Sequence, residues 1–285
     1  MNVSSKLKMP RRNEPASSTI DWWLRDAAEQ LANANIRSAL LDAEILLAHT
    51  LRKSRTYLHA HGKDEISPRL LDIANARLRL RLDRTPVAYI VGHKWFFGRM
   101  FKVSPSVLIP RPESETILEL LAKYHDGTSK RLVDIGTGSG CLGITAKLEH
   151  PELTVILSDV DRKALVVAKE NAHILGAKLH ILESDLFSII PGVFDYVIAN
   201  LPYVDTSWER SPETNAEPPL ALFAGSHGLA LINDLLRDLP SKLSSGGIAF
   251  IEADPTQHNA IRRAATKLKL EHIETTDYTV VLKKS

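Results

Sequence analysis

Hydrophobic residues recur at helical spacing through residues 18–83. Thr19 can cap a first helix, the segment 39–49 carries apolar residues on one helical face, and Pro68 suits the first turn of a later helix. We therefore predict an N-terminal helical domain over residues 17–85.

The last of these helices carries Arg77, Arg79, Arg81 and Arg84. A charge run of this kind is usually a solvated helix face. The alternative is a docking surface for an acidic partner or RNA, and the sequence leaves both interpretations open.

Short β-prone runs follow Pro86 and are separated by Gly92, Gly98 and Pro105. They lie at 87–91, 95–98, 101–103 and 107–109. Such runs between turn residues predict a hairpin, which we place in a β-hairpin linker over residues 86–112.

Strands and helices alternate over residues 113–285. Candidate strands lie at 131–135, 153–158, 178–182, 194–199 and 247–252, with a final pair near 270–274 and 278–282. This alternation predicts an α/β domain with a mostly parallel, Rossmann-like sheet and right-handed crossovers.

The bulk composition narrows the function classes. The 285 residues leave room for about two domains, and a net charge of +2 gives no reason to expect stable binding of nucleic acid. Cys141 is the single cysteine, so neither an intramolecular disulfide nor a thiolate metal cluster can form. No apolar run approaches the roughly 18 residues that span a bilayer, and the polar, basic start has no secretory signal. We expect a cytoplasmic protein whose residues 1–16 form a disordered tail.

A glycine-rich loop follows the first strand of this domain, with Gly136, Gly138 and Gly140 at alternate positions. Parallel α/β sheets bind ligands at the carboxyl ends of their strands. We expect this loop, Thr137 and Ser139 included, to contact a nucleoside cofactor. By itself the loop fits NAD, S-adenosylmethionine or only a tight structural turn.

Two further segments follow strand ends and can complete the cofactor site. Asp159 ends the second strand, where a carboxylate accepts hydrogen bonds from ribose hydroxyls. Leu186 can line an adenine pocket and Asp185 can meet the adenine amino group. The alternative for this second segment is an ordinary helix cap at Ser184 or Asp185.

The tetrapeptide of Asn200, Leu201, Pro202 and Tyr203 follows the strand predicted at 194–199. The Asn200 side-chain oxygen and the Leu201 carbonyl can each accept one N–H from a planar NH2 group. These contacts would orient the nitrogen and stabilise positive charge that develops on it. Pro202 stiffens the turn, and Tyr203 offers a flat ring. The pattern indicates methyl transfer to an amide or amino nitrogen, and the alternative is a strand-ending turn.

With these features in place, the chain resembles the protein-(glutamine-N5) methyltransferases, most closely the branch that modifies peptide chain release factors. The similarity covers nearly the whole chain beyond the tail. Its most specific parts are the linker and the segment 217–229, because other methyltransferases with this sheet lack them.

The resemblance implies a class I S-adenosylmethionine-dependent methyltransferase domain. It implies that S-adenosyl-L-methionine contacts residues 136–140, Asp159, Leu186 and Asn200, and that residues 200–203 recognise the substrate amide. The implied substrate is the glutamine of the Gly-Gly-Gln loop in class I peptide chain release factors. The helical domain would then dock this partner.

Two positions depart from the family pattern. Leu201 stands where the family usually has the first proline of Asn-Pro-Pro-Tyr. The main-chain acceptor survives this change, but Asn-Leu-Pro-Tyr also occurs in ribosomal RNA adenine N6-dimethyltransferases. Ser114 replaces a more usual threonine and keeps the hydroxyl.

Three alternatives to glutamine methylation follow from these residues. An adenine N6-methyltransferase acting on ribosomal RNA would explain Leu201, although such enzymes place their extra helices after the catalytic domain. An NAD-dependent dehydrogenase would leave the tetrapeptide and the segment 217–229 without a role, and a decayed site would not keep Asp159 and Asn200. His93, His227 and His258 lack metal-ligand spacing, so we expect no metal, and we expect a monomer.

Overall fold

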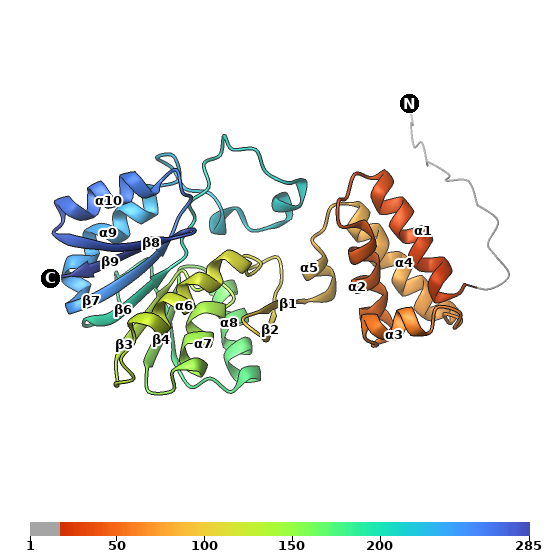
Figure 1. Cartoon of the computed structure of the whole chain (residues 1–285), viewed down its shortest axis with the longest axis horizontal. Helices are drawn as coiled ribbons and strands as arrows, with labels where there is room; N and C mark the ends of the chain where they lie inside the picture. The colour runs from red at the N-terminus through yellow and green to blue at the C-terminus, as the bar shows by residue number, and fades with distance from the viewer. Residues whose placement is uncertain (1–17) are drawn as a thin grey trace, which may run out of the picture. The chain divides into compact units, whose positions relative to one another are not determined.

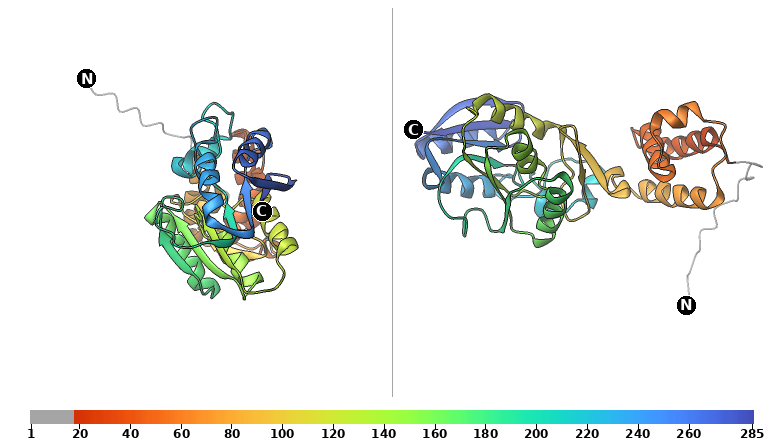
Figure 2. Two further views of the ribbon diagram at one scale, coloured as in Figure 1. Left: turned by 90° about the vertical axis from the view of Figure 1, so that its left-hand side faces the viewer. Right: turned by 90° about the horizontal axis from the view of Figure 1, so that it is seen from below.

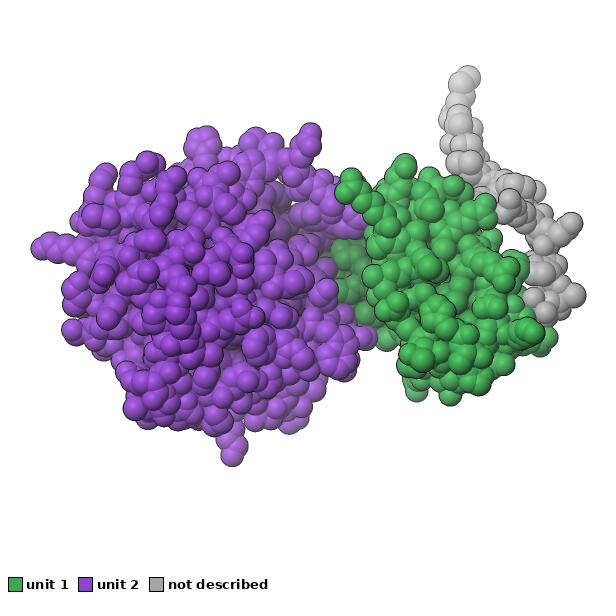
Figure 3. Space-filling model, viewed as in Figure 1, with its two compact units in different colours: residues 1–91 green, residues 92–285 purple. Residues whose placement is uncertain are grey.

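The computed structural model describes residues 18–285, and the predicted tail lies outside the described residues. The chain divides into two compact units, residues 1–91 and 92–285, which Figure 3 colours separately. Each unit has its own hydrophobic core.

The described part of the first unit is helical, as predicted. Its helices are α1 (Ile20–Asn33), α2 (Ala39–Leu51), α3 (Arg55–Ala60), α4 (Pro68–Leu82) and α5 (Val87–Val91). The Thr19 side chain accepts a hydrogen bond from the Trp22 N–H and so caps α1. Trp23, Leu46 and Leu58 are fully buried between the helices.

The β-prone run Val87–Val91 forms α5 instead of a strand, so the prediction for this run was wrong. The N–H groups of Tyr89 and Ile90 donate to the Pro86 carbonyl at 3.0 and 3.2 Å. A proline pre-organises the first turn of a helix, and here this local effect outweighs the β propensity of the valines.

The arginines of α4 are engaged inside the helical unit. Arg81 Nε donates to Asp42 Oδ2 at 2.7 Å, and both side chains are buried. Arg77 donates to Thr50 Oγ1 at 2.6 Å, and Arg84 donates to the carbonyl group at the end of α1. Arg77, Arg81 and Arg84 are therefore not a solvated face, and that interpretation was wrong for them, whereas Arg79 is exposed. The docking alternative stays a prediction.

The second unit is built on a seven-stranded sheet with strand order β5-β4-β3-β6-β7-β9-β8. The strands are β3 (Arg131–Ile135), β4 (Thr154–Asp159), β5 (His180–Glu183), β6 (Phe194–Ala199), β7 (Leu243–Glu252), β8 (Leu270–Thr276) and β9 (Thr279–Lys284). The neighbours from β5 to β7 pair in parallel, whereas β9 is antiparallel to β7 and β8. The predicted α/β class is confirmed.

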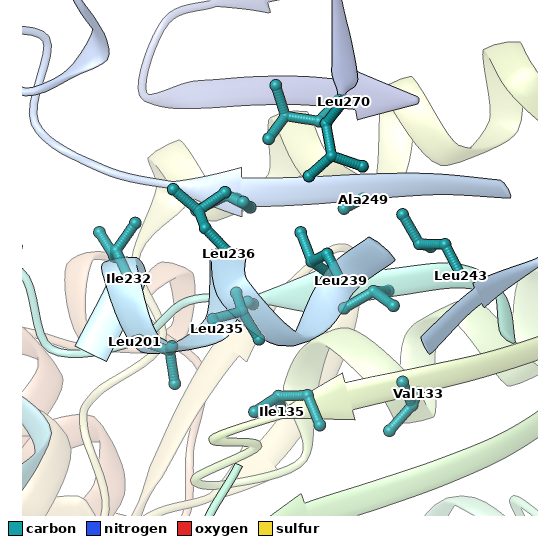
Figure 4. Packing of buried hydrophobic residues seen from close by; sticks show 14 of the residues in the cluster. Val133, Ile135, Leu201, Ile232, Leu235, Leu236, Leu239, Leu243, Ala249 and Leu270 are labelled. Carbon is teal, nitrogen blue, oxygen red and sulfur yellow. The ribbon is translucent and has the colours of Figure 1, made fainter. Parts of the chain in front are cut away.

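Helices cover both faces of this sheet (Figures 1 and 2). One face carries α6 (Glu115–Tyr124), α7 (Cys141–Glu149) and α8 (Arg162–Leu175), and the other carries α9 (Ala230–Lys242) and α10 (His258–Lys267). Leu132 and Val133 are adjacent in β3 and pack in opposite layers, as the alternation of a strand requires. Figure 4 shows the layer beneath α9, which includes Val133 and Leu201.

A hairpin of β1 (His93–Phe96) and β2 (Arg99–Lys102) opens the second unit. Phe97 and Gly98 both have positive φ, 46° and 71°, as a two-residue turn of the primed type requires. The predicted hairpin is therefore present. The run 107–109 forms no strand, so that part of the prediction was wrong.

The strand order reverses between β3 and β6, and this reversal positions the site. The chain runs outward from β3 through β4 and β5 and then returns to β6, on the other side of β3. Sheets of this kind bind ligands beyond the carboxyl ends of the strands at such a reversal. Ile135 and Ala199 end these two strands in register, so the glycine loop and Asn200 meet there.

Candidate active site

The glycine-rich loop joins β3 to α7 through conformations that favour glycine. Gly136, Gly138 and Gly140 have φ angles of 71°, 54° and 82°. A Cβ atom on Gly136 would lie 2.8 Å from Leu201 Cδ2, and one on Gly140 would lie 2.7 Å from Ile144 Cδ1. The positive φ angles and the close approach of Leu201 and Ile144 therefore favour glycine in this loop.

A cavity of about 340 Å³ lies at the carboxyl ends of β3, β4 and β6. This volume falls within the range of roughly 300–1,000 Å³ that is usual for small-molecule sites. Most residues predicted to bind cofactor or substrate line it: Gly136, Thr137, Gly138, Ser139, Asp159, Asp185, Leu186, Asn200, Leu201 and Pro202.

Two of the predicted site residues lie outside this lining. Gly140 occupies the N-cap position of α7. Tyr203 lines a neighbouring cavity of about 260 Å³. Asn200 and Leu201 line both cavities, so the two spaces meet at the tetrapeptide.

Asp159 ends β4 and is held by main-chain donors. Its Oδ2 accepts from the Gly138 N–H at 2.9 Å, and its Oδ1 accepts from the Asp161 N–H at 2.9 Å. Burial raises the pKa of this carboxyl above its ordinary value, although the two hydrogen bonds oppose the rise. Each oxygen keeps a lone pair for a ligand hydroxyl.

The segment after β5 forms a turn beside Asp159. The Ser184 N–H donates to the Asp159 carbonyl at 3.0 Å, and the Ser184 hydroxyl donates to the Leu186 carbonyl at 3.0 Å. Leu186 has a φ of 45°, in the left-handed region. Residues 185–189 form a bend and a turn, not an α-helix, so the helix-cap alternative was wrong.

Asp134 precedes the glycine loop on β3 and was missed as a site residue. It is 1% exposed, and its Oδ2 accepts from Thr137 Oγ1 at 2.6 Å and from the Gly143 N–H at 2.9 Å. Its Oδ1 has no hydrogen-bond partner. Burial raises its pKa to about 6. A carboxylate inside an apolar strand was the available sequence signal.

Asn200 lies in a polar group that sequence reasoning did not assemble. Asn200 Nδ2 donates to Ser114 Oγ at 3.0 Å, and the Tyr203 hydroxyl donates to Glu252 Oε1 at 3.2 Å. Glu252 is 1% exposed. Burial raises its pKa to about 7, although the nearby donors Ser114, Tyr203 and Asn200 oppose the rise. Burial and Glu252 likewise raise the pKa of Tyr203.

The Leu201 side chain belongs to the core beneath the cavity. It is 4% exposed and packs in the same cluster as Ile135 and Leu235 (Figure 4). At position 201, where the family usually has proline, this chain therefore has a leucine whose side chain packs in the core.

The segment 217–229 is attached to the site by buried polar contacts. Glu217 accepts from Arg111 Nη2 at 2.6 Å and from the Ile109 N–H at 3.2 Å. Gln257 Nε2 donates to the carbonyls of Tyr203 and His227 at 2.8 and 2.9 Å. These contacts fix the wall of the second cavity.

His125, His150 and Glu152 form a separate polar cluster at the opposite end of the sheet. Each offers one potential metal-ligand atom, and these atoms lie within 4.8 Å of one another. Glu152 already pairs with both histidines, and burial lowers the pKa of His150. No helix within residues 18–285 is long and apolar enough to cross a membrane.

Comparisons with known proteins match both units. Residues 23–92 match the family described as PrmC N-terminal domain, and residues 112–214 match the family described as methyltransferase small domain. A release factor glutamine methyltransferase of Cereibacter sphaeroides is 36% identical over 84% of this chain and 86% of its own length. One of Escherichia coli is 33% identical over 89% of this chain and 92% of its own length.

Solved structures share the fold at lower identity. A methyltransferase from Pyrococcus furiosus aligns with a TM-score of 0.53 and 18% identity over 74% of this chain and 98% of its own. A 16S rRNA N2 G1207 methyltransferase of T. thermophilus, solved with AdoMet and guanosine, gives 0.52 and 16% over 68% of this chain and 50% of its own.

Proposed function

Because the chain belongs to the release factor glutamine methyltransferase family, we propose that it methylates the glutamine side chain of the Gly-Gly-Gln motif in class I peptide chain release factors. The protein is an S-adenosylmethionine-dependent methyltransferase, and the methyl acceptor is the amide nitrogen, N5. One observation carries the assignment of the site. Asn200 donates its Nδ2 to Ser114 where two cavities meet, which leaves its Oδ1 as an acceptor.

The residues of the first cavity fit S-adenosyl-L-methionine. The glycine loop offers main-chain atoms, Asp159 offers acceptors for ribose hydroxyls, and Asp185 and Leu186 flank the place for adenine. Asp134 holds a buried oxygen without a partner beneath the loop, which suits a cofactor with cationic groups. When bound, this cofactor supplies an electrophilic methyl carbon.

The tetrapeptide would orient the acceptor nitrogen. Asn200 Oδ1 and the Leu201 carbonyl each accept one N–H of the glutamine NH2 group, and Tyr203 borders the space on the substrate side. As the nitrogen becomes positive, two fixed acceptors stabilise it better than they stabilise the neutral amide. The protein therefore needs no strong base, because the proton can leave after the nitrogen is charged.

The helical unit is proposed to dock the release factor. The match of residues 23–92 to the PrmC N-terminal domain supports a role tied to this family. Because Arg77 and Arg81 are engaged internally, exposed side chains such as Trp22, Leu40 and Leu41 are better candidates for the contact. We further infer a cytoplasmic monomer without stable nucleic-acid binding, in keeping with a release factor as the partner.

A three-way labelling experiment tests the assignment. The full-length protein is incubated with radiolabelled S-adenosylmethionine, a class I release factor and ribosomal RNA together. Label on the release factor supports the proposal, and label on the RNA contradicts it. A release factor with the motif glutamine replaced by asparagine is the matched control and should stay unlabelled. The names of the relatives do not favour the adenine alternative.

A further inference from the structure

We propose that Glu252 is a positioning residue of this site: as a carboxylate, it acts with Ser114 to hold the Asn200 amide with Oδ1 turned toward the methyl-accepting nitrogen. The inference rests on the proposed function, because it concerns the acceptors for the substrate NH2 group. It adds a residue of β7 and a residue of η1 (Pro112–Ser114) to a site otherwise built from strand-end loops.

Strand register brings Glu252 to Asn200. Ala199 pairs with Ile251 in the parallel ladder between β6 and β7. The next residues along the two strands are Asn200 and Glu252, at the carboxyl edge of the sheet. Ser114 is 2% exposed and reaches the same point from η1. Three separate elements therefore bring their polar side chains together at one buried place.

The donors and acceptors of this group can be assigned one by one. Asn200 Nδ2 donates to Ser114 Oγ at 3.0 Å, so the Ser114 proton must go elsewhere. The Tyr203 hydroxyl donates to Glu252 Oε1 at 3.2 Å, and Glu252 Oε2 is a buried acceptor without a hydrogen-bond partner. A carboxylate accepts hydrogen bonds and cannot donate one. An ionised Glu252 offers the Ser114 proton a buried acceptor, which leaves Ser114 Oγ to accept from Asn200 Nδ2. A flipped Asn200 would set its Oδ1 beside the carboxylate at the neighbouring strand position.

Protonation of Glu252 would remove the constraint on which groups donate and which accept. A neutral carboxyl brings an O–H donor into the group, so one of the present donors must turn away or become an acceptor. Asn200 could then satisfy the group in either amide orientation. Only one of these orientations presents Oδ1 to the glutamine nitrogen.

The surroundings of Glu252 determine the pH at which its carboxyl becomes protonated. Its Oε2 has no hydrogen-bond partner, and no ion pair of Glu252 occurs within residues 18–285. Besides Tyr203, the ionisable side chains that line the second cavity with Glu252 are Arg111, Glu113, Glu209, Arg210, Asp254 and Tyr278. Arg111 pairs with Glu217 at 2.6 Å. Burial and the charge of Glu113 raise the pKa of Glu252 to about 7, so the ionised form is lost as the pH falls through neutrality.

Four variants of the full-length protein test this role. Glu252→Gln keeps the shape and removes the charge, and Ser114→Ala removes the hydroxyl that accepts from Asn200 Nδ2. Ser114→Thr keeps the hydroxyl and serves as the conservative rescue. Glu274→Gln is the matched control, because Glu274 also accepts from a tyrosine hydroxyl, at 2.7 Å from Tyr124, but lies on β8 away from the site.

Methyl transfer from labelled S-adenosylmethionine to a class I release factor is measured from about pH 6 to about pH 9, a range that spans the Glu252 pKa of about 7. In the wild type, kcat/KM should fall by about tenfold from pH 8 to pH 6, as one ionisation with this pKa requires. Glu252→Gln should lower kcat by about tenfold or more, a smaller loss than removal of a direct contact, and should abolish this acid limb. Ser114→Ala should also lower kcat, and Ser114→Thr should restore it.

The readouts separate positioning from mere structure. Calorimetry should give the same cofactor dissociation constant for wild type, Glu252→Gln and Glu274→Gln. Wild-type kcat in Glu252→Gln, an acid limb that persists in that variant, or a loss of cofactor affinity that accounts for the lower rate would overturn the inference. If Glu252→Gln fails to fold, full activity of Ser114→Ala overturns it instead. If the wild type methylates no release factor, the proposed function is refuted. If the wild type is active and Glu252→Gln is equally active, only the role of Glu252 is refuted.

Discussion

The helical unit and the methyltransferase unit bury their carboxylates in different ways. In the helical unit, buried Asp42 pairs with Arg81 at 2.7 Å, and buried Glu44 pairs with Arg55 at 2.5 Å. In the methyltransferase unit, buried Glu217 likewise pairs with Arg111 at 2.6 Å, but Asp134 and Glu252 differ: each is 1% exposed and has no ion pair within the described residues 18–285. Each also keeps one oxygen without a hydrogen-bond partner.

This difference separates a structural charge from a functional one. A buried charge with a close counter-ion fixes the arrangement of helices, and its removal exposes the partner to desolvation. A buried carboxyl without a counter-ion is costly in the free protein, and such groups concentrate at functional sites. Asp134 lies next to the glycine loop, and Glu252 lines the cavity that borders Asn200.

The largest expected effect breaks the paired side of this comparison. Arg81→Met leaves Asp42 buried without its counter-ion and should lower the free energy of unfolding by about 3–5 kcal/mol. Urea denaturation followed by circular dichroism measures this change. The double variant Asp42→Leu/Arg81→Met should recover most of the loss, and an undiminished stability in Arg81→Met would show that the pair has no structural role.

Removal of the Asn200 side chain tests the acceptor on the functional side. Asn200→Ala should lower the rate of methyl transfer by roughly 10²–10³, the usual loss for one pre-organised polar contact. Single-turnover kinetics with a saturating release factor isolates this step. A rate within a factor of about two of the wild type, well inside that loss, would exclude Asn200 from the mechanism.

Neutralisation of Glu252 should have the opposite sign in stability to the loss of Arg81. Burial raises the Glu252 pKa from 4.5 to about 7. A carboxyl with a raised folded-state pKa stabilises the fold below its unfolded pKa and loses this contribution as the pH rises through about 7. At pH 8, Glu252→Gln should therefore be more stable than wild type by about 3 kcal/mol.

Thermal or urea denaturation at several pH values checks this sign. The gain should shrink as the pH falls and vanish below about pH 4, where both states carry the protonated acid. A Glu252→Gln protein less stable than wild type at pH 8 would place Glu252 with the structural charges of the helical unit.

The smallest expected effect concerns Asp159, which is half-buried and held by main-chain donors. Asp159→Ala removes the proposed ribose contact and should weaken binding of S-adenosylmethionine by about 1.5–3 kcal/mol. Isothermal titration calorimetry gives this number directly. Asp126→Ala is the control and should leave the affinity near that of wild type, because Asp126 is exposed in the loop before β3 and does not line the cavity.

Local signals were enough for much of the fold and part of the site. Strand alternation placed all seven strands of the sheet to within a few residues, except for an early start of β7. The glycine loop and the tetrapeptide can be recognised in the sequence, because each consists of turn-forming residues at a few consecutive positions. Ten of the predicted residues line one cavity, because parallel strands bring their carboxyl ends to the same edge.

The rest depends on partners that are distant in the sequence. The sequence could not predict the ion pair of Arg81, because its partner Asp42 lies 39 positions away. Ser114 and Glu252 carry no local signal of function, since only the register of β6 with β7 and the placement of η1 bring them to Asn200. Periodicity reports which face of an element is buried, but not which polar groups meet there.

Mass spectrometry of the release factor tests the central claim most directly. A class I release factor is incubated with S-adenosylmethionine and either the wild type or Asn200→Ala, and the peptide that contains Gly-Gly-Gln is fragmented. The account predicts one added methyl group on the glutamine side-chain nitrogen with the wild type and almost none with Asn200→Ala. A methyl group on another residue, or equal modification by both proteins, would contradict it.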